Sequence, residues 1–424
     1  MKRLLDINAS KLLSLLLFIS LTTATFAQEE YSESDPGDDE NTNTASYKLG
    51  NGLQFSFNEG NYNFKLSGFI QPSYFLETQD GLNDINQFNS KRSFLQFEGN
   101  ALKEKVSFFV QLDYSLSSPL LDAWLAYEPF EQLKISVGQK QTFVNNREML
   151  IREDRLQFND RSFLSQNLSQ TGREFGLFLE SKFTIGNKFG IAPKAAITSG
   201  DGRNSFGNDS RDTDLGGFKI GGRLDIYPLG FFKPGNDLTT ADLGREETLK
   251  AVIGVAGSQN NGASNTVGEG HGDFFLYDIN GANSLPDYEQ FYADLLMKYK
   301  GFSFLAEYAS TAASDIDLVF IDENATQILA PQQISEYLAL GETYNLQLGY
   351  VTKNGYSFDL RYETGTPEFE NNPISILGEY NATTFGFTKY FLKNGLKFQA
   401  SYSVINPLVG ENINQFQVLF QIAL

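Results

Sequence analysis

Cysteine is absent from the 424-residue sequence, and histidine occurs once, as His271. Without cysteine there is no disulfide framework, no cysteine-based zinc site and no thiol nucleophile. A single histidine makes a histidine-rich metal site and a hydrolase with a histidine base poor interpretations. We therefore expect no metal, no cofactor and no catalytic centre, and we interpret His271, in the glycine-rich stretch 268–273, as a loop residue.

Positive charge and long apolar runs are also scarce. The sequence has 33 Lys and Arg against 52 Asp and Glu, a formal net charge of -19. Binding to nucleic acid needs clustered basic residues, so we expect no nucleic-acid partner. No stretch of about 18 apolar residues occurs, which excludes spanning a membrane with helices. The apolar content of 41%, rich in Phe and Tyr, also excludes a disordered protein.

The N-terminus predicts export. Residues 1–27 combine a basic flank, a short apolar run over 12–21 and small residues before Gln28, which is typical of a cleaved signal peptide. The apolar run is too short for a transmembrane anchor, which needs about 20 residues. Cleavage would remove three basic residues and one acidic residue, changing the net charge from -19 to -21.

Two further segments follow the predicted signal peptide. Residues 28–48 are strongly acidic at their start and include Pro36 and Gly37, so we expect a disordered leader. Residues 49–424 are dominated by a period of two, in which apolar and polar side chains alternate. Such alternation predicts strands with one apolar and one polar face. The clearest predicted strands are 106–116, 356–363, 396–404 and 415–424.

The connections between these strands are of two lengths. Asn354-Gly355 and Asn394-Gly395 predict tight hairpins, whereas longer polar, glycine-rich stretches lie at 199–216, 257–273, 309–317 and 363–376. Short turns alternating with long loops indicate an up-and-down antiparallel barrel of an outer membrane. At roughly 22–23 residues per strand and connection, the chain allows about 16 strands. A soluble β-sandwich fits less well, because an exported chain with aromatic-rich strand faces favours a closed barrel in lipid.

The stretch 64–183 resembles the phosphate-selective porin O and P family. The resemblance rests on the order and spacing of six segments: FKLSGFIQ (64–71), KRSFLQFEG (91–99), LDAWLAY (121–127), ISVGQK (135–140), DRS (160–162) and GREFGL (172–177). It implies a 16-stranded, homotrimeric porin in outer-membrane lipid. It also implies that the loop after the third strand, residues 140–173, folds inward as a constriction loop.

The resemblance further implies that basic side chains in the lumen conduct anions. Arg92 corresponds to the basic pair of the family, and the predicted constriction loop holds Lys140, Arg147, Arg152, Arg155, Arg161 and Arg173. Strand alternation adds Lys65, Arg223 and Arg361 to the candidate pore-lining, anion-binding residues. An alternative is that the arginines of the loop form salt bridges that attach it to the barrel wall.

The sequence thus predicts an outer-membrane porin, a passive diffusion channel for small hydrophilic solutes and not an enzyme. Preference for anions or phosphate is a hypothesis, because the negative net charge opposes it while a local ring of bases can override net charge in a narrow pore. The alternative function is a non-conducting scaffold, an adhesin or a barrel gated by a partner.

Overall fold

The computed structural model describes residues 43–186, 188–204, 216–270, 272–369 and 372–424. The predicted signal peptide, most of the predicted leader and His271 lie outside the described residues. The last five residues of the predicted leader, Thr44–Lys48, form a strand.

Strands make up nearly all of the regular structure. They are β1 (Thr44–Lys48), β2 (Gly52–Phe57), β3 (Tyr62–Gln79), β4 (Ile85–Ala101), β5 (Val106–Asp113), β6 (Leu120–Phe130), β7 (Leu133–Gln141), β8 (Arg173–Ser181), β9 (Phe183–Ile185), β10 (Phe189–Thr198), β11 (Lys219–Tyr227), β12 (Lys250–Asn260), β13 (Asp287–Tyr299), β14 (Phe302–Ser314), β15 (Gly341–Val351), β16 (Tyr356–Pro367), β17 (Tyr380–Leu392), β18 (Leu396–Pro407) and β19 (Ile413–Ala423). The short helices are α2 (Arg147–Leu150), η1 (Glu153–Arg155), α3 (Phe163–Leu168) and η3 (Pro331–Glu336). No helix among the described residues is long and apolar enough to cross a membrane.

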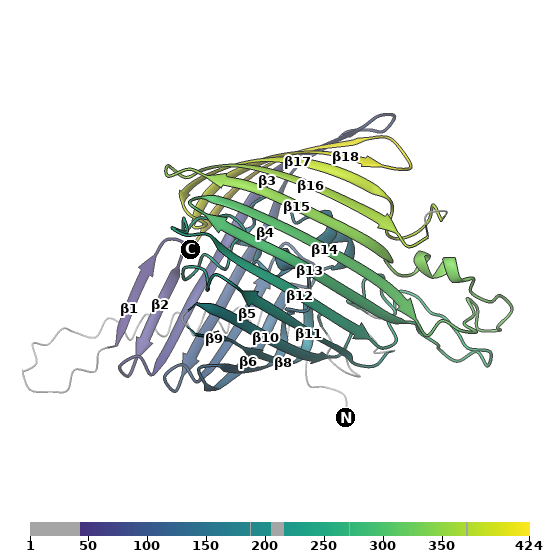
Figure 1. Ribbon diagram of the computed structural model, residues 1–424, viewed down its shortest axis with the longest axis horizontal. Helices are drawn as coiled ribbons and strands as arrows, with labels where there is room; N and C mark the ends of the chain where they lie inside the picture. Colours follow the sequence, from purple (N-terminus) through teal and green to yellow (C-terminus); the bar gives the residue numbers. More distant parts are fainter. Residues whose placement is uncertain (1–42, 187, 205–215, 271, 370–371) are drawn as a thin grey trace, which may run out of the picture. The chain divides into compact units, whose positions relative to one another are not determined.

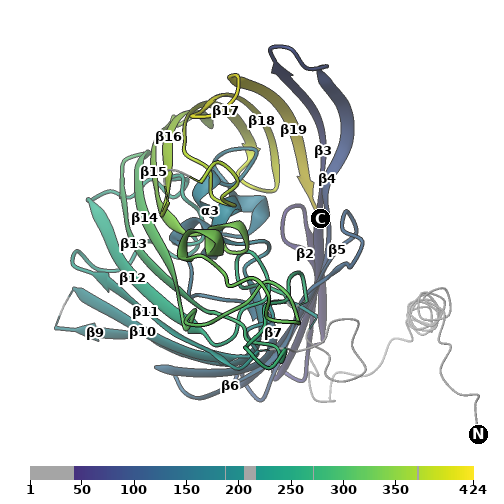
Figure 2. The ribbon, with the colours of Figure 1, turned by 90° about the vertical axis from the view of Figure 1, so that its right-hand side faces the viewer.

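The strands form a closed antiparallel barrel, as Figure 1 and Figure 2 show. β8 and β9 both pair with β10 and together form one strand of the wall. β19 pairs with β3 from Ile413↔Gln79 to Ala423↔Phe69, which closes the ring. Of the nineteen strands in the sheet, β1 and β2 lie outside the ring, and β8 and β9 count as one, so sixteen strands form the wall. The predicted fold and strand number are confirmed.

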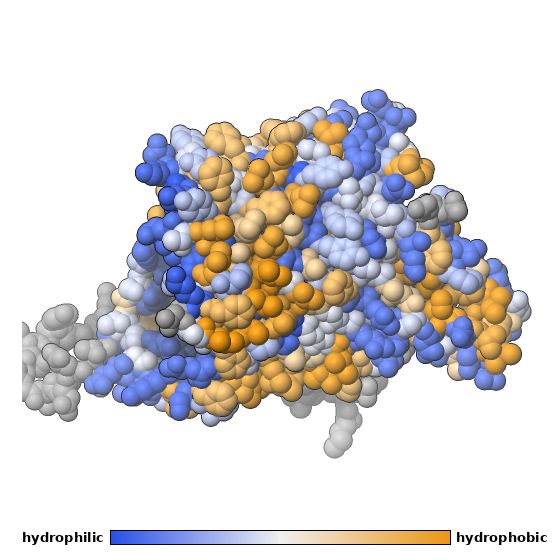
Figure 3. All heavy atoms as spheres, in the orientation of Figure 1, coloured by the Kyte–Doolittle hydropathy of each residue, from blue (hydrophilic) through white to orange (hydrophobic). Residues whose placement is uncertain are grey.

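Alternation along each strand separates an apolar outer face from a polar inner face. In β19, Phe420 is 53% exposed on the outside, whereas Gln421 is 1% exposed on the inside. Figure 3 shows apolar side chains in a band across the outer wall and hydrophilic ones at the end of the short turns. Because successive side chains of a strand point to opposite faces, this separation follows directly from the sequence pattern.

The two ends of the barrel differ in the length of their connections. At one end, the turn end, β15–β16 and β17–β18 are joined by the Asn-Gly hairpins at 354–355 and 394–395. At the other, the loop end, the connections are longer. The strand predicted over 106–116 stops at Asp113, because the Asp113 carboxylate accepts hydrogen bonds from the backbone N–H groups of Ser93 and Ser115.

One long connection at the turn end was not predicted. Residues 228–249, between β11 and β12, turn into the barrel instead of forming a tight hairpin. Lys298, on the inner face of β13, donates hydrogen bonds to three carbonyls of this inward turn segment: those of Asn236, Thr239 and Ala241. The buried carboxylate of Asp242 accepts from the backbone N–H of Gly301 at 2.7 Å. These contacts hold the segment inside the turn end of the barrel.

β1 and β2 extend the wall at the turn end. β2 pairs with the first part of β3, from Leu53↔Leu66 to Phe57↔Tyr62, below the part of β3 that pairs with β19. β1 pairs with β2 and adds a further strand. The inner faces of β1 to β7 thereby form a groove of about 500 Å³ beyond the closed ring.

Candidate functional site

The candidate site is the lumen, which is narrowed by the constriction loop. Residues 142–172 leave the wall after β7, fold inside the ring and return at β8. The loop therefore follows the fifth strand of the barrel, and the expectation that it follows the third is wrong. Figure 2 shows α3 within the ring of strands. Leu164 and Leu168 of α3 are buried in a cluster with Phe178 and Tyr292 of the wall.

The first attachment of the constriction loop is a set of hydrogen bonds around Glu148. Its carboxylate accepts from the backbone N–H and hydroxyl of Ser162, the hydroxyl of Ser165 and the amide of Gln347 in β15. The backbone N–H of Glu148 donates to the carboxylate of Glu307 in β14 at 2.7 Å. Buried carboxylates with this many donors hold a loop in one conformation, because breaking any of them leaves a buried charge unpaired.

The second attachment lies at residues 154–157. The amide of Gln157 donates to the carboxylate of Asp359 in β16. Lys397 in β18 and Gln421 in β19 donate to backbone carbonyls of the loop, at Leu156 and Asp154 respectively. The loop is thus fixed against β13 to β19 and faces β4 to β7 across the lumen.

Arg147 attaches the loop to the adjoining part of the wall. Its guanidinium contacts the carboxylates of Asp225 in β11 and Asp294 in β13, and Arg223 bridges the same two carboxylates. The Arg147 side chain is 8% exposed. Two shared carboxylates and burial leave neither arginine available to solutes in this conformation.

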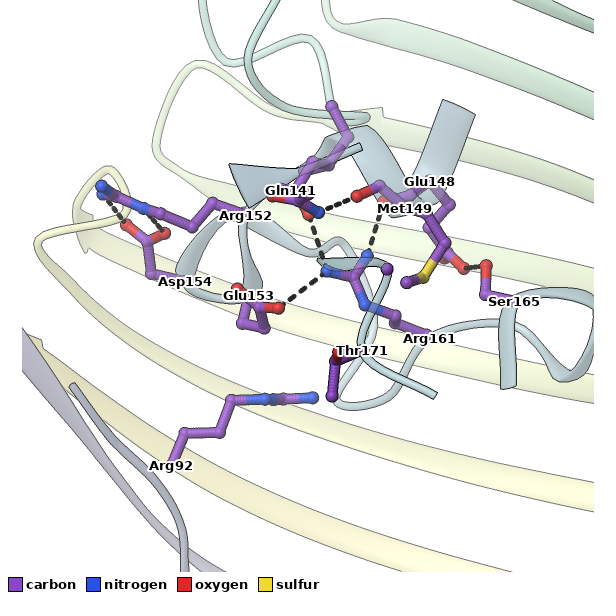
Figure 4. Close-up of polar contacts among 12 residues, drawn as sticks. Arg92, Gln141, Glu148, Met149, Arg152, Glu153, Asp154, Arg161, Ser165 and Thr171 are labelled. Atoms are coloured by element: carbon purple, nitrogen blue, oxygen red, sulfur yellow. Dashed lines mark hydrogen bonds and ion pairs between the residues drawn. The ribbon is translucent and has the colours of Figure 1, made fainter. Parts of the chain in front are cut away.

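Arg161 and Arg173 enclose Glu153. Their guanidinium groups lie 3.0 Å and 2.8 Å from the Glu153 carboxylate, and Arg173 also contacts Asp122. Burial opposes the charged carboxylate, but Arg173 and Arg161 outweigh it and hold the pKa of Glu153 well below its usual range. Figure 4 shows the contact between Arg161 and Glu153, with Arg92 pointing toward Thr171.

Arg152 and Arg155 are the more exposed arginines of the loop. Their side chains are 29% and 26% exposed, and both contact the carboxylate of Asp154, which is 6% exposed. Arg152 also donates to the amide oxygen of Gln96 on the wall at 3.1 Å. Burial raises the pKa of Asp154, but the Arg152 guanidinium beside it outweighs burial and lowers that pKa. The group holds two cations and one anion.

Lys91 and Arg92, on β4, form a second such group with Asp160 of the loop. Lys91 and Arg92 approach the Asp160 carboxylate to 2.6 Å and 3.8 Å, and Asp160 is 29% exposed. Burial opposes ionisation, but the charges of Lys91 and Arg92 lower the pKa of Asp160 to about 2. This group too has two cations and one anion.

We call the part of the constriction loop that carries these two groups, residues 152–160, the loop tip. The remaining predicted residues are paired away from it. Lys140 forms an ion pair with Glu180, and Lys65 lies in the groove at the turn end, paired with Glu98 at 2.5 Å. Arg361 is 3% exposed between Glu148 and Glu363. Of the ten predicted residues, the structure therefore brings Arg92, Arg152 and Arg155 to the accessible lumen around the loop tip, and ties Arg147, Arg161, Arg173, Arg223 and Arg361 into buried ion pairs.

The constriction loop has a cavity on each side. Toward the loop end, a cavity of about 210 Å³ is lined by Arg92, Asp113, Glu153 and Asp160 among others. Toward the turn end, a cavity of about 440 Å³ is lined by Trp124, Lys140, Arg152 and Asp237 among others. The hydroxyl of Thr239 in the inward turn segment donates to the carbonyl of Arg155. The narrow part of the lumen is therefore bounded by two inward segments, one from each end of the barrel.

Several residues that position the loop were not predicted. Asp294 and Glu307 lie on inner faces, so strand alternation was sufficient to find them. Gly254 and Gly349 also face inward, and an added Cβ would collide with the Arg223 and Arg147 guanidinium groups or with the Gln157 amide. A glycine at an inward position of a strand is the only trace of these contacts in the sequence.

Comparisons with known proteins support the fold. No family model and no curated protein matches the sequence, so the resemblance to phosphate-selective porins is not confirmed. Among solved structures, a loop-L8 deletion mutant of the outer membrane protein OmpT of Vibrio cholerae has 11% identity and a TM-score of 0.52, covering 86% of this chain and 100% of that chain. The outer membrane channel DcaP of Acinetobacter baumannii has 11% identity and a TM-score of 0.50, covering 87% of this chain and 99% of that chain. The trimer form of OmpT also has a TM-score of 0.50, at 10% identity, covering 86% of this chain and 99% of that chain.

The described residues show no metal centre. They contain no group of three or more His, Asp or Glu side chains that could hold a metal ion. The carboxylates of Asp154 and Asp160 at the constriction are paired with arginine or lysine groups.

Proposed function

We propose that the protein is an outer-membrane porin, a passive diffusion channel for small hydrophilic solutes and not an enzyme. The closed sixteen-stranded wall has an apolar outside and a polar inside, which suits lipid on one face and water on the other. In such porins the short turns face the periplasm and the long loops face the outside, so we place the turn end at the periplasm and the loop end at the cell exterior. The inward loop sets the size limit and the accessible charges set selectivity.

We propose further that the channel prefers anions, with phosphate as the first one to test. The observation that carries this proposal is the charge of the two accessible groups at the constriction. Arg152 and Arg155 share one carboxylate, and Lys91 and Arg92 share one carboxylate. Each group retains one positive charge, and charges a few ångströms from the path of a solute outweigh distant ones.

We propose a homotrimer in outer-membrane lipid as the assembly. The outer wall has large exposed apolar side chains, including Leu125, Val137 and Phe358, that suit either lipid or a second subunit. The trimer form of OmpT has the same type of barrel. Chemical cross-linking of the folded protein in detergent tests the assembly, with a three-subunit product expected.

Single-channel recording in a planar bilayer tests the channel. We expect steady conductance from the protein alone and a decrease when phosphate is added to a chloride solution. The double variant Arg152→Gln/Arg155→Gln is expected to lose most of the phosphate block. Lys389→Gln, on the outer face of β17, removes a similar charge away from the lumen and is expected to behave as wild type.

A barrel that opens only with a partner is the second candidate. The observation in its favour is that Arg152 crosses the lumen and contacts Gln96 of the opposite wall. Absence of conductance from correctly folded protein would support this second function and exclude free diffusion.

A further inference from the structure

The only tryptophan of the sequence faces the lumen. Trp124 in β6 lies directly opposite Phe109 in β5 in the strand register, and their ring centroids are 5.8 Å apart. Phe178 and Tyr292 also face inward but are buried against the constriction loop, whereas these two rings line open cavities. No step of the proposed anion selectivity uses these two rings.

The two rings lie on the route between the constriction and the turn end. Both line the cavity of about 440 Å³ beside the constriction loop, and both line the groove of about 500 Å³ formed by the inner faces of β1 to β7. A solute that passes the loop on this side of the lumen therefore leaves over Trp124 and Phe109. Each volume falls in the range of small-molecule sites, about 300–1,000 Å³.

The charges around the two rings are balanced one to one. Lys134 is 3.4 Å from the Glu128 carboxylate and Lys140 is paired with Glu180, and their ammonium groups lie 5.0 Å and 5.4 Å from the Trp124 ring centroid. This contrasts with the two cations per carboxylate at the loop tip. A charged solute gains little from such balanced pairs, because each attraction is offset by a nearby repulsion.

A hydroxyl-bearing solute suits this surface better. A hydroxyl donates one hydrogen bond and accepts two, so it can pair with ammonium, carboxylate and amide groups alike. Besides the ion pairs, the amide side chains of Gln111 and Gln141 line the cavity of about 440 Å³, together with the carboxylate of Asp122. Aromatic rings add a flat apolar surface for the C–H face of a saturated ring.

We infer that Trp124 and Phe109 form a binding site for a small neutral carbohydrate on its way to the periplasm. The ring of the sugar stacks on the two aromatic side chains, and its hydroxyls exchange hydrogen bonds with the balanced polar groups around them. The site adjoins the anion-preferring groups at the loop tip, because Arg152 also lines the cavity of about 440 Å³, so one channel would pass anions at the constriction and retain sugars beside it. The inference rests on the proposed channel only for the route by which sugar arrives.

The fluorescence of Trp124 can be used to measure binding at this site. As the single tryptophan, it supplies all of the tryptophan fluorescence of the folded, detergent-solubilised protein. Titration with maltose is expected to change that fluorescence saturably, whereas the acyclic polyol mannitol is expected to change it little. A maltose titration without saturation would overturn the inference, and so would saturation by benzoate but not by maltose.

Variants of Phe109 separate stacking from structure. Phe109→Leu keeps an apolar side chain but removes the ring, and is expected to weaken maltose binding about three- to tenfold, with recovery in Phe109→Tyr. Leu125→Ala, on the outer face beside Trp124, is the matched control and is expected to bind as wild type. Equal affinity in wild type and Phe109→Leu would contradict the site.

The fluorescence titration tests the carbohydrate site, and the conductance measurement tests the channel, so each proposal can be rejected without the other. Saturable maltose binding without conductance would retain the carbohydrate site and reject the free channel. Conductance without saturable binding would retain the channel and reject the site.

Discussion

Individual arginines of the constriction loop differ in whether their guanidinium groups are accessible from the lumen or enclosed by ion pairs. Arg147 and Arg152 are five residues apart, yet Arg147 is buried between Asp225 and Asp294 whereas Arg152 is 29% exposed beside one carboxylate. The sequence identified both as candidates and left the salt-bridged alternative open. The pairing of Arg147 depends on carboxylates 78 and 147 positions away in the chain, so no local pattern could separate the two roles.

Arg173 is expected to be structural. Arg173→Met leaves the carboxylates of Glu153 and Asp122 without this partner, and breaking a buried ion pair costs about 3–5 kcal/mol of the free energy of unfolding. Guanidinium unfolding of the protein in detergent measures the loss. Lys389→Met is the control, with a change below about 1 kcal/mol. Equal stability of Arg173→Met and wild type would show that the pair does not hold the loop.

Asp160 is expected to limit anion selectivity. Asp160→Asn removes the one carboxylate beside Lys91 and Arg92, so the reversal potential at neutral pH should move further toward anions. The folded-state pKa of Asp160, about 2, lies below its ordinary value of 3.8. Its ion pairs therefore stabilise the fold above about pH 4 and are lost as pH falls through about 2. Wild type should approach Asp160→Asn in that acidic range; a cation-directed shift in the variant contradicts this role.

Among the elements, strands were predictable and the inward turn segment was not. Alternation located β5, β16, β18 and β19 to within a few residues, because the faces of a strand in a barrel wall have opposite solvents. Residues 228–249 are held by Lys298 through backbone carbonyls, which carry no sequence information. Neither the length of this connection nor its inward direction was predicted.

The inward turn segment is expected to restrict the channel from the periplasmic end. Lys298→Met removes the donor to the carbonyls of Asn236, Thr239 and Ala241 and is expected to loosen the segment. Single-channel conductance should rise and become noisier. Lys300→Met, outside the lumen at the adjoining turn, serves as the control. Unchanged conductance in Lys298→Met would place the narrowest point at the constriction loop alone.

For the whole molecule, the net charge and the local charge point in opposite directions. The chain has a net charge of -19, yet the accessible groups at the loop tip are each positive by one. Fold class and strand number followed from length and alternation, since both are global consequences of a closed wall in lipid. The sign of the charge that lines the lumen could not be predicted in this way, because it depends on which charges the folded chain leaves unpaired.

The reversal potential of wild-type channels across a salt gradient tests this account most directly. Potassium chloride at two concentrations, with the folded protein in a planar bilayer, measures which ion passes more readily. We expect a potential of the sign given by chloride, because Arg152, Arg155, Lys91 and Arg92 outnumber Asp154 and Asp160 at the accessible loop tip. A potential of the potassium sign would contradict the account and show that the net negative charge governs the lumen.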